Sequence, residues 1–196
     1  MLQSALVNIP AQSRAFCSNR EGKIMSRIQY ENSLRAKGFE DIGKGVYANV
    51  FAKPNSDKVV KVANLDSWPT YIKWATENGY AGKFAPKVDS LKFHDDFYVA
   101  TMERLVGTMH DFYHRASSIH NELYHEITSW YVDESTSEAT DLIKFVTKLK
   151  AAKLTGDWHF GNVMVRKDGQ IVITDPSARP FDGKPFRIKS GQITAP

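Results

Sequence analysis

Cysteine is almost absent from this chain of 196 residues, in which Cys17 is the single one. One cysteine excludes an internal disulfide and a zinc site built from several cysteines, and it is typical of proteins in a reducing compartment. Long hydrophobic runs are also lacking, because no apolar stretch approaches the ~20 residues that a helix needs to cross a bilayer. We therefore expect a cytoplasmic protein without a membrane partner.

A strong charge of one sign is lacking as well. The 26 Lys and Arg residues against 22 Asp and Glu residues leave a formal net charge of +4, and the basic residues are scattered along the chain. A dedicated nucleic-acid surface is therefore not indicated, and a site for a polyphosphate would account for part of the basic excess. The hydrophobic content of 42% is typical of a globular protein with one core or two small lobes.

The N-terminal segment, residues 1–26, has no sustained hydrophobic periodicity, and we assign it no chemistry. Its first residues contain Arg14, Arg20 and several serines but no acid, a composition that transit peptides share. We prefer the simpler interpretation of a poorly ordered terminus. Residues 26–37 then predict a short helix that ends at Gly38.

Polar residues that carry chemistry gather near the C-terminal end. Two short apolar runs, 163–166 and 171–174, are separated by a turn and predict a β-hairpin. Asp157 and Asn162 precede its first strand and Asp175 follows its second, so the hairpin brings two carboxylates and a carboxamide to one end. Hard oxygen ligands of this kind suit Mg²⁺, which binds through few protein groups together with substrate phosphates.

The spacing from Asp157 to Asn162 and on to Asp175 resembles the catalytic and metal-binding loops of the protein-kinase superfamily. The form Gly-Asp-Trp-His-x-x-Asn at 156–162 is closer to atypical and small-molecule kinases than to the His-Arg-Asp loop of eukaryotic protein kinases. It is most similar to the early serine/threonine kinases of lytic tailed bacteriophages of the podovirus type, which share an Asp-x-His-x-Gly-Asn-x-Met loop and a strand ending in Ile-Thr-Asp-Pro. The alternative for this stretch alone is an ordinary hairpin, since Asp and Asn are common turn residues.

The resemblance implies ATP and Mg²⁺ as cofactors and transfer of the γ-phosphate to a hydroxyl group. Asp157 would accept or orient the proton of that hydroxyl, while Asn162 and Asp175 would hold the magnesium ion. Lys61 would bind the α- and β-phosphates, which makes Asp157, Lys61 and Asn162 the implied catalytic residues. His159 receives no role.

Two glycines between predicted strands, in the stretch 39–52, match the glycine-rich loop of kinases with alanine in the third glycine position. Glycine lets a backbone come close to phosphates and direct its amides at them. A plain hairpin turn would account for the same glycines if they stood alone. The resemblance assigns nucleotide contacts to Gly43, Lys44, Gly45, Ala48 and Val50.

Lys61 lies within the apolar run 58–63, which predicts a buried strand, and a buried lysine is costly unless it is paired. In the kinase pattern its partner is a glutamate of the next helix. Asp66 or Ser67 is a suitable N-cap for that helix, and Glu77 is its only glutamate and thus the expected partner. On an exposed face Glu77 would instead pair with a lysine one turn back, at position 73.

A second hairpin is predicted at 90–94 and 97–103, and residues 99–106 resemble the strand and hinge that join the two lobes of a kinase. Backbone groups of Glu103 and Leu105 would then bind the adenine edge, with Met102 beside the ring. A plain core role for Met102 and Leu105 is the alternative. Beyond the hinge, the apolar spacing predicts helices over 107–133 and 139–154.

We therefore expect an α+β, minimal two-lobe protein-kinase-like fold, with the resemblance covering residues 38–180. The expected units are a poorly ordered segment at 1–26, an antiparallel-sheet N-lobe at 27–105, and a reduced, mainly helical C-lobe at 106–196. No Phe-Gly follows Asp175 and no Ala-Pro-Glu motif appears, so the long activation segment of eukaryotic kinases has no counterpart.

The expected function is that of an ATP- and Mg²⁺-dependent serine/threonine protein kinase acting on host proteins, such as transcription or translation proteins, in the host cytoplasm. Two alternatives remain open. Small-molecule kinases of the aminoglycoside or choline type share the Asp-x-His-x-x-Asn loop, although they usually have a larger C-lobe. A catalytically silent kinase fold that binds a protein partner would explain the missing substrate platform, whereas the presence of Lys61, Asp157, Asn162 and Asp175 favours catalysis.

Overall fold

The computed structural model describes residues 25–108, 137–157, 160–177, 181 and 183–195, which form an α+β fold of three α-helices and two antiparallel sheets. The helices are α1 (Arg27–Ala36), α2 (Trp68–Glu77) and α4 (Ser137–Ala151), with a short 3₁₀ helix η1 (Phe160–Asn162). The strands are β1 (Glu40–Lys44), β2 (Ala48–Ala52), β3 (Lys58–Asn64), β4 (Val88–Phe93), β5 (Phe97–Glu103), β6 (Gly107–Thr108), β7 (Val163–Val165), β8 (Ile171–Ile173), β9 (Arg187–Lys189) and β10 (Gln192–Thr194). In these ranges no helix has the length and apolar character to span a membrane.

Local sequence patterns predicted most of these elements. The glycine-interrupted hairpin is β1 and β2, the lysine strand is β3, the next hairpin is β4 and β5, and the polar-ended hairpin is β7 and β8. The prediction of a helix over 107–133 is wrong for its first two residues. Gly107 and Thr108 instead form strand β6, which pairs with Val165 and Met164 of β7. The remainder of that expected helix lies outside the described residues.

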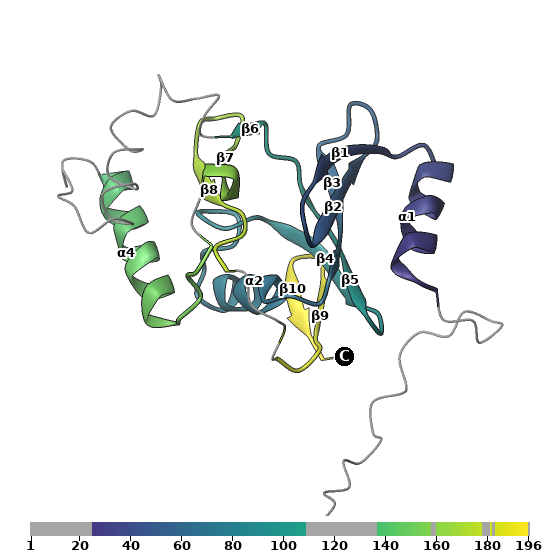
Figure 1. Ribbon diagram of the computed structural model, residues 1–196. Helices are drawn as coiled ribbons and strands as arrows, with labels where there is room; N and C mark the ends of the chain where they lie inside the picture. Colours follow the sequence, from purple (N-terminus) through teal and green to yellow (C-terminus); the bar gives the residue numbers. More distant parts are fainter. Residues whose placement is uncertain (1–24, 109–136, 158–159, 178–180, 182, 196) are drawn as a thin grey trace, which may run out of the picture.

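Seven strands form the larger sheet in the order β1-β2-β3-β5-β4-β9-β10, each antiparallel to its neighbours (Figure 1). The C-terminal hairpin joins this sheet where Ser90 and Leu91 of β4 lie opposite Lys189 and Ile188 of β9. After β8 the chain thus returns to the sheet that begins at β1. Strands β9 and β10 therefore extend the larger sheet beside β4 rather than the β6-β7-β8 sheet.

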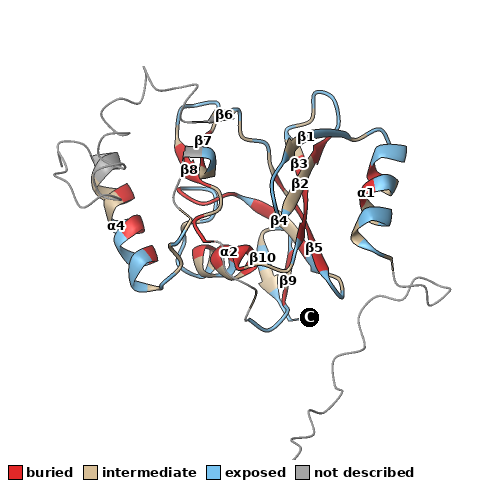
Figure 2. Cartoon of the chain, viewed as in Figure 1, coloured by how far each residue is buried: buried red, intermediate tan, exposed pale blue. Residues whose placement is uncertain are grey.

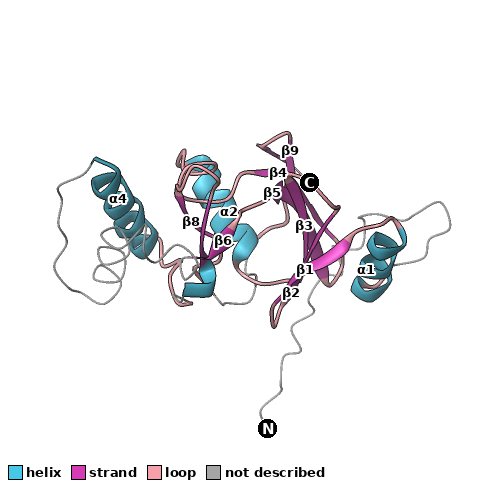
Figure 3. Ribbon diagram, turned by 90° about the horizontal axis from the view of Figure 1, so that it is seen from above, coloured by secondary structure: helices cyan, strands magenta, loops and turns pink. Residues whose placement is uncertain are grey.

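Alternation of side chains along β3 separates two cores on the two faces of the larger sheet. Val60 and Val62 pack beneath α1, whereas Val59 and Ala63 belong to the core that includes α2 (Figure 3). Residues two apart on a strand share a face. Lys61 therefore lies on the face that α2 covers, which is also the face nearer the smaller sheet.

Helix α2 covers that face with a stripe of buried side chains, namely Trp68, Tyr71, Ile72 and Ala75. Their spacing of three and four residues lines one side of a helix. Burial of a side chain such as Ile72 contributes about 1.5–3 kcal/mol. The same core cluster continues into β7, β8 and α4 (Figure 2), so both sheets share one hydrophobic core.

The first turn of α2 is tied to the segment that follows β8 by hydrogen bonds from side chains to backbone carbonyls. The Ser67 hydroxyl donates to the Ser177 carbonyl (2.9 Å) and the Trp68 indole to the Thr174 carbonyl (2.8 Å). The Tyr71 hydroxyl donates to the Ile173 carbonyl (2.7 Å). The N-cap residue and two side chains of the helix thereby fix the backbone on both sides of Asp175.

Substitution of Tyr71 by phenylalanine tests this attachment. The Tyr71 side chain is fully buried, and burial raises the pKa of its hydroxyl well above the ordinary value, so the hydroxyl remains a donor. Tyr71→Phe removes that donor from the Ile173 carbonyl, and we expect the free energy of unfolding to fall by about 1–3 kcal/mol. Urea unfolding measures the change. Tyr47→Phe, at an exposed tyrosine, is the control and should leave the free energy of unfolding unchanged.

Candidate functional site

Strands β7 and β8 form the predicted hairpin, in which Val163 lies opposite Ile173 and Val165 opposite Ile171. The turn contains Gly169, whose φ of 90° is a conformation that side chains with a Cβ rarely adopt. The loop before β7 and the segment after β8 meet at one end of the hairpin. This end carries the polar residues that the sequence singled out.

Hydrogen bonds join the two segments at that end. The Asn162 Nδ2 donates to the Asp157 backbone carbonyl (2.9 Å) and to its carboxylate (3.2 Å). The Thr174 amide and hydroxyl both donate to the Asn162 carbonyl, at 2.7 and 2.9 Å, and the Asp157 amide donates to the Pro176 carbonyl at 3.0 Å. Asp157, Asn162 and the backbone on both sides of Asp175 thus form one polar cluster. The neighbouring Trp158 and His159 lie outside the described residues.

Lys61 reaches this cluster from the larger sheet. Its Nζ lies 2.9 Å from Oδ2 of Asp175, although the two residues are 114 positions apart in the chain. The lysine side chain is 9% exposed and the aspartate side chain 27%, so the pair lies at the edge of the core. The same Nζ lies 4.3 Å from the centre of the Trp68 ring, where the ammonium gains a cation–π interaction. The structure thus brings together two of the residues that the sequence proposed for catalysis and metal binding.

Glu77 does not lie at Lys61, and the pairing expected from the kinase pattern is not formed. The Glu77 side chain is 53% exposed, and its Oε1 lies 3.7 Å from Nζ of Lys73, which is the alternative pairing. The physical reason is the phase of α2. At about 100° per residue, Glu77 lies roughly 180° around the helix from Trp68 and so faces away from the core.

The glycine-rich stretch forms the β1–β2 hairpin, with Gly43 opposite Val50 and the Gly45 amide donating to the Ala48 carbonyl at 2.7 Å. Neither glycine has a positive φ. A Cβ added at either one would meet its nearest atom at 3.6 Å, an ordinary contact distance. The described backbone therefore does not itself require glycine here, whereas a ligand lying against the loop would benefit from the missing side chains.

The stretch expected to be a hinge connects β5 to β6. Met102 is buried in the main core, and the Glu103 carboxylate binds Arg166 through two hydrogen bonds of 2.7 and 2.8 Å. Two parallel bonds of this kind give a geometrically specific ion pair. Leu105 lies between two fixed amides, since those of Arg104 and Val106 donate to backbone carbonyls. The connection between the two sheets is thus held in one position.

A family model described as bacteriophage T7 protein kinase 0.7 matches residues 5–182, which is most of the chain. The chain belongs to this phage protein kinase family. No curated protein matches it. The resemblance to early phage kinases, drawn from the loop at 156–164 and the strand end at 173–176, is confirmed by this match.

Asp66 lies next to Trp68 near this polar cluster, and the sequence analysis considered it only as a helix cap. Its Oδ1 accepts hydrogen bonds from the Trp68 amide (3.0 Å) and the Tyr98 hydroxyl (3.1 Å). Burial raises the pKa of the Asp66 carboxyl, and the positive charge of Lys61 opposes that rise. Asp66 is thus a third carboxylate close to the ion pair. Its place directly after the lysine strand was the one sequence signal that could have indicated this.

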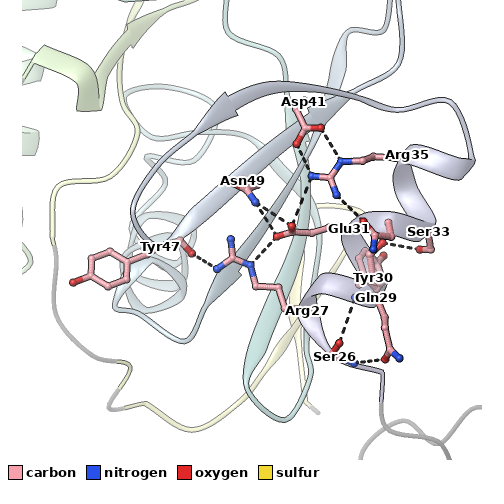
Figure 4. A network of polar contacts seen from close by, with 11 residues as sticks. Ser26, Arg27, Gln29, Tyr30, Glu31, Ser33, Arg35, Asp41, Tyr47 and Asn49 are labelled. Atoms are coloured by element: carbon pink, nitrogen blue, oxygen red, sulfur yellow. Dashed lines mark hydrogen bonds and ion pairs between the residues drawn. The ribbon is translucent and has the colours of Figure 1, made fainter.

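Helix α1 is the second feature that sequence reasoning left without a role. Arg27 donates to the Tyr47 carbonyl at the tip of the β1–β2 hairpin (2.9 Å) and to the Asn64 side chain (2.7 Å). Arg27 also pairs with the buried Glu31, which accepts two further bonds of 3.0 Å from Asn49 of β2 (Figure 4). Polar contacts from α1, centred on the buried Glu31, therefore hold the glycine-rich hairpin from its outer side.

The variant Glu31→Ala tests this network. It leaves Arg27 and Asn49 without their shared buried carboxylate, and we expect the free energy of unfolding to fall by about 3 kcal/mol. Amide hydrogen exchange at 44–48 should also become faster, because the hairpin tip is held through Arg27. Glu40→Ala, at an exposed glutamate of β1, is the matched control. Equal exchange at the tip in both variants would contradict the role assigned to α1.

Proposed function

We propose that this member of the phage kinase family is an ATP- and Mg²⁺-dependent serine/threonine protein kinase that phosphorylates host proteins. The observation that supports it most is the ion pair between Lys61 and Asp175 beside the hydrogen-bonded Asp157 and Asn162. A lysine from the sheet, an aspartate after β8 and an Asp–Asn loop before β7 are the groups that phosphoryl transfer needs together. In the proposed two-lobe division, residues 27–105 form the N-lobe and 106–196 the C-lobe, except that β9 and β10 of the second range pair with the N-lobe sheet.

The residues at the site fit a magnesium ion of the kind that nucleotides bring with them. Asn162 uses its amide nitrogen to bond Asp157, which turns its amide oxygen, the atom that a metal requires, away from that contact. In the described part of the chain no group of three or more His, Cys, Asp and Glu side chains could hold a metal ion. Two protein ligands, Asn162 and Asp175, suit Mg²⁺, because it retains waters and takes oxygens from phosphates. The ion would neutralise charge on the phosphates as they are transferred.

The chain's own groups then have separate tasks. Asp157 orients the acceptor hydroxyl and takes its proton, in a position fixed by Asn162. Lys61 contacts the α- and β-phosphates, and the glycine-rich loop 43–48, with Lys44, lies over them. Val50 packs against the nucleotide from β2. The backbone of Glu103 and Leu105 binds the adenine edge, beside Met102.

Phosphate transfer from radiolabelled ATP tests the proposal, with the purified protein incubated alone or with bacterial lysate in the presence of Mg²⁺. Asp157→Ala should bind ATP as wild type does but lose about 10²- to 10⁴-fold in rate, because the proton acceptor is missing. Asp168→Ala, an exposed aspartate in the turn of the same hairpin, is the control and should keep the wild-type rate. Label found only in small molecules would favour a small-molecule kinase. Absence of both transfer and nucleotide binding would contradict a catalytic function.

The metal role has a separate test in nucleotide affinity. Wild-type affinity for ATP should depend on Mg²⁺, and Asp175→Ala should abolish that dependence because the carboxylate ligand is gone. Titration calorimetry with and without Mg²⁺ measures it. A variant whose affinity still responds to Mg²⁺ as wild type does would remove Asp175 from the metal site.

A further inference from the structure

Lys61 is largely buried and requires a counter-ion. Among the described residues its ion-pair partner is Asp175, which the proposed function assigns to the metal ion. In the proposed function Asp175 turns to the magnesium ion, and a largely buried ammonium that loses its only carboxylate becomes costly. Glu77 cannot replace it, because that side chain is exposed on the opposite side of α2. The nucleotide phosphates would then pair with the ammonium, but they belong to the ligand, so a carboxylate of the protein is needed to hold Lys61 in place against them.

Asp66 lies where such a group is needed. Its Oδ1 accepts from the Trp68 amide and the Tyr98 hydroxyl, and the Trp68 ring is the surface over which the Lys61 ammonium lies. The Trp68 and Tyr98 rings are stacked, with centroids 5.5 Å apart and an interplanar angle of 1°. Among the described residues, both bonds to the carboxylate end on Oδ1. Oδ2 is therefore the oxygen that an approaching ammonium would meet.

The charges of the three groups already influence one another. Burial raises the pKa of Asp66, the positive charge of Lys61 lowers it, and the negative charge of Asp175 raises it again. Opposite charges in a partly buried site attract more strongly than in water. Once a metal compensates Asp175, the repulsion on Asp66 falls and the attraction between Asp66 and Lys61 remains.

We propose that Asp66 is the positioning residue that holds Lys61 against the nucleotide phosphates while Asp175 binds the metal. Asp66 thereby takes the part that the sequence pattern assigned to Glu77. The inference rests on the proposed function for the movement of Asp175, but the contact between Asp66 and Lys61 can be tested without catalysis.

The kinetic test compares Asp66→Asn with wild type on dephosphorylated casein. Asn keeps an oxygen for both hydrogen bonds and loses only the charge. We expect kcat to fall roughly 10- to 100-fold with a smaller change in the KM for ATP, because misplacement of a catalytic group affects the transition state most. Asp66→Glu, which keeps the charge, should recover part of the rate. Asp96→Asn, an exposed aspartate of the β4–β5 turn, should behave as wild type. A wild-type kcat for Asp66→Asn, or the loss appearing in Glu77→Gln instead, would overturn the proposal.

A double-mutant cycle in thermal unfolding separates this inference from the proposed function. In the wild-type background Asp66→Asn should leave the melting temperature unchanged or raise it, because a half-buried charge is removed while Lys61 keeps Asp175. In the Asp175→Ala background the same change leaves Lys61 without a carboxylate, and the melting temperature should fall. Additive effects of the two substitutions would overturn the proposal whether or not the protein transfers phosphate. Coupling without phosphate transfer would support the Asp66–Lys61 contact and contradict the proposed function alone.

Discussion

The contact between the Lys61 ammonium and the Asp175 carboxylate is the interaction on which the arrangement of this site depends. A lysine inside a buried strand is unfavourable unless an opposite charge lies within reach. That charge comes from the far end of the chain, so β8 and the segment after it must be placed against the sheet. Trp68 and Tyr71 do this by binding the backbone carbonyls that precede Asp175, and Ser67 binds the Ser177 carbonyl that follows it. The position of the charged pair therefore depends on the packing of α2 against the segment around Asp175.

The glycine-rich hairpin is held in place by polar contacts rather than by a buried ion pair with the far end of the chain. Its tip exposes Val46 and Tyr47, and the glycines make no contact that demands the absence of a side chain. Polar contacts from α1 hold the hairpin through the Tyr47 carbonyl and the Asn49 side chain, on the outer side of the sheet. At Gly43 and Gly45 the hairpin carries no side chain that would cover its backbone. In the proposed function this loop would bind phosphate, which calls for a fixed backbone with exposed amides.

Sequence patterns predicted the parts of the fold that short-range rules control. Hairpins follow from turn residues between apolar runs, and the burial of Lys61 follows from its apolar neighbours in β3. Glu77 was misassigned because membership of a helix does not state on which side of it a residue lies, and here the stripe beginning at Trp68 decides. The pairing of β9 with β4 had no local signature, since it joins segments about a hundred residues apart. Asp66 was overlooked because its role as a possible helix cap already explained an aspartate at that position.

The fold alone does not require the two glycines of the β1–β2 hairpin or the charge of Asp66. A Cβ at Gly43 or Gly45 would meet only ordinary contacts, so the structure would accept alanine there. An asparagine at 66 would accept the hydrogen bonds of Trp68 and Tyr98 as well as aspartate does, without the cost of a half-buried charge. What these residues add is open backbone in one case and negative charge in the other. In the proposed function both properties would act on a charged partner, namely the nucleotide phosphates for the glycines and the Lys61 ammonium for Asp66.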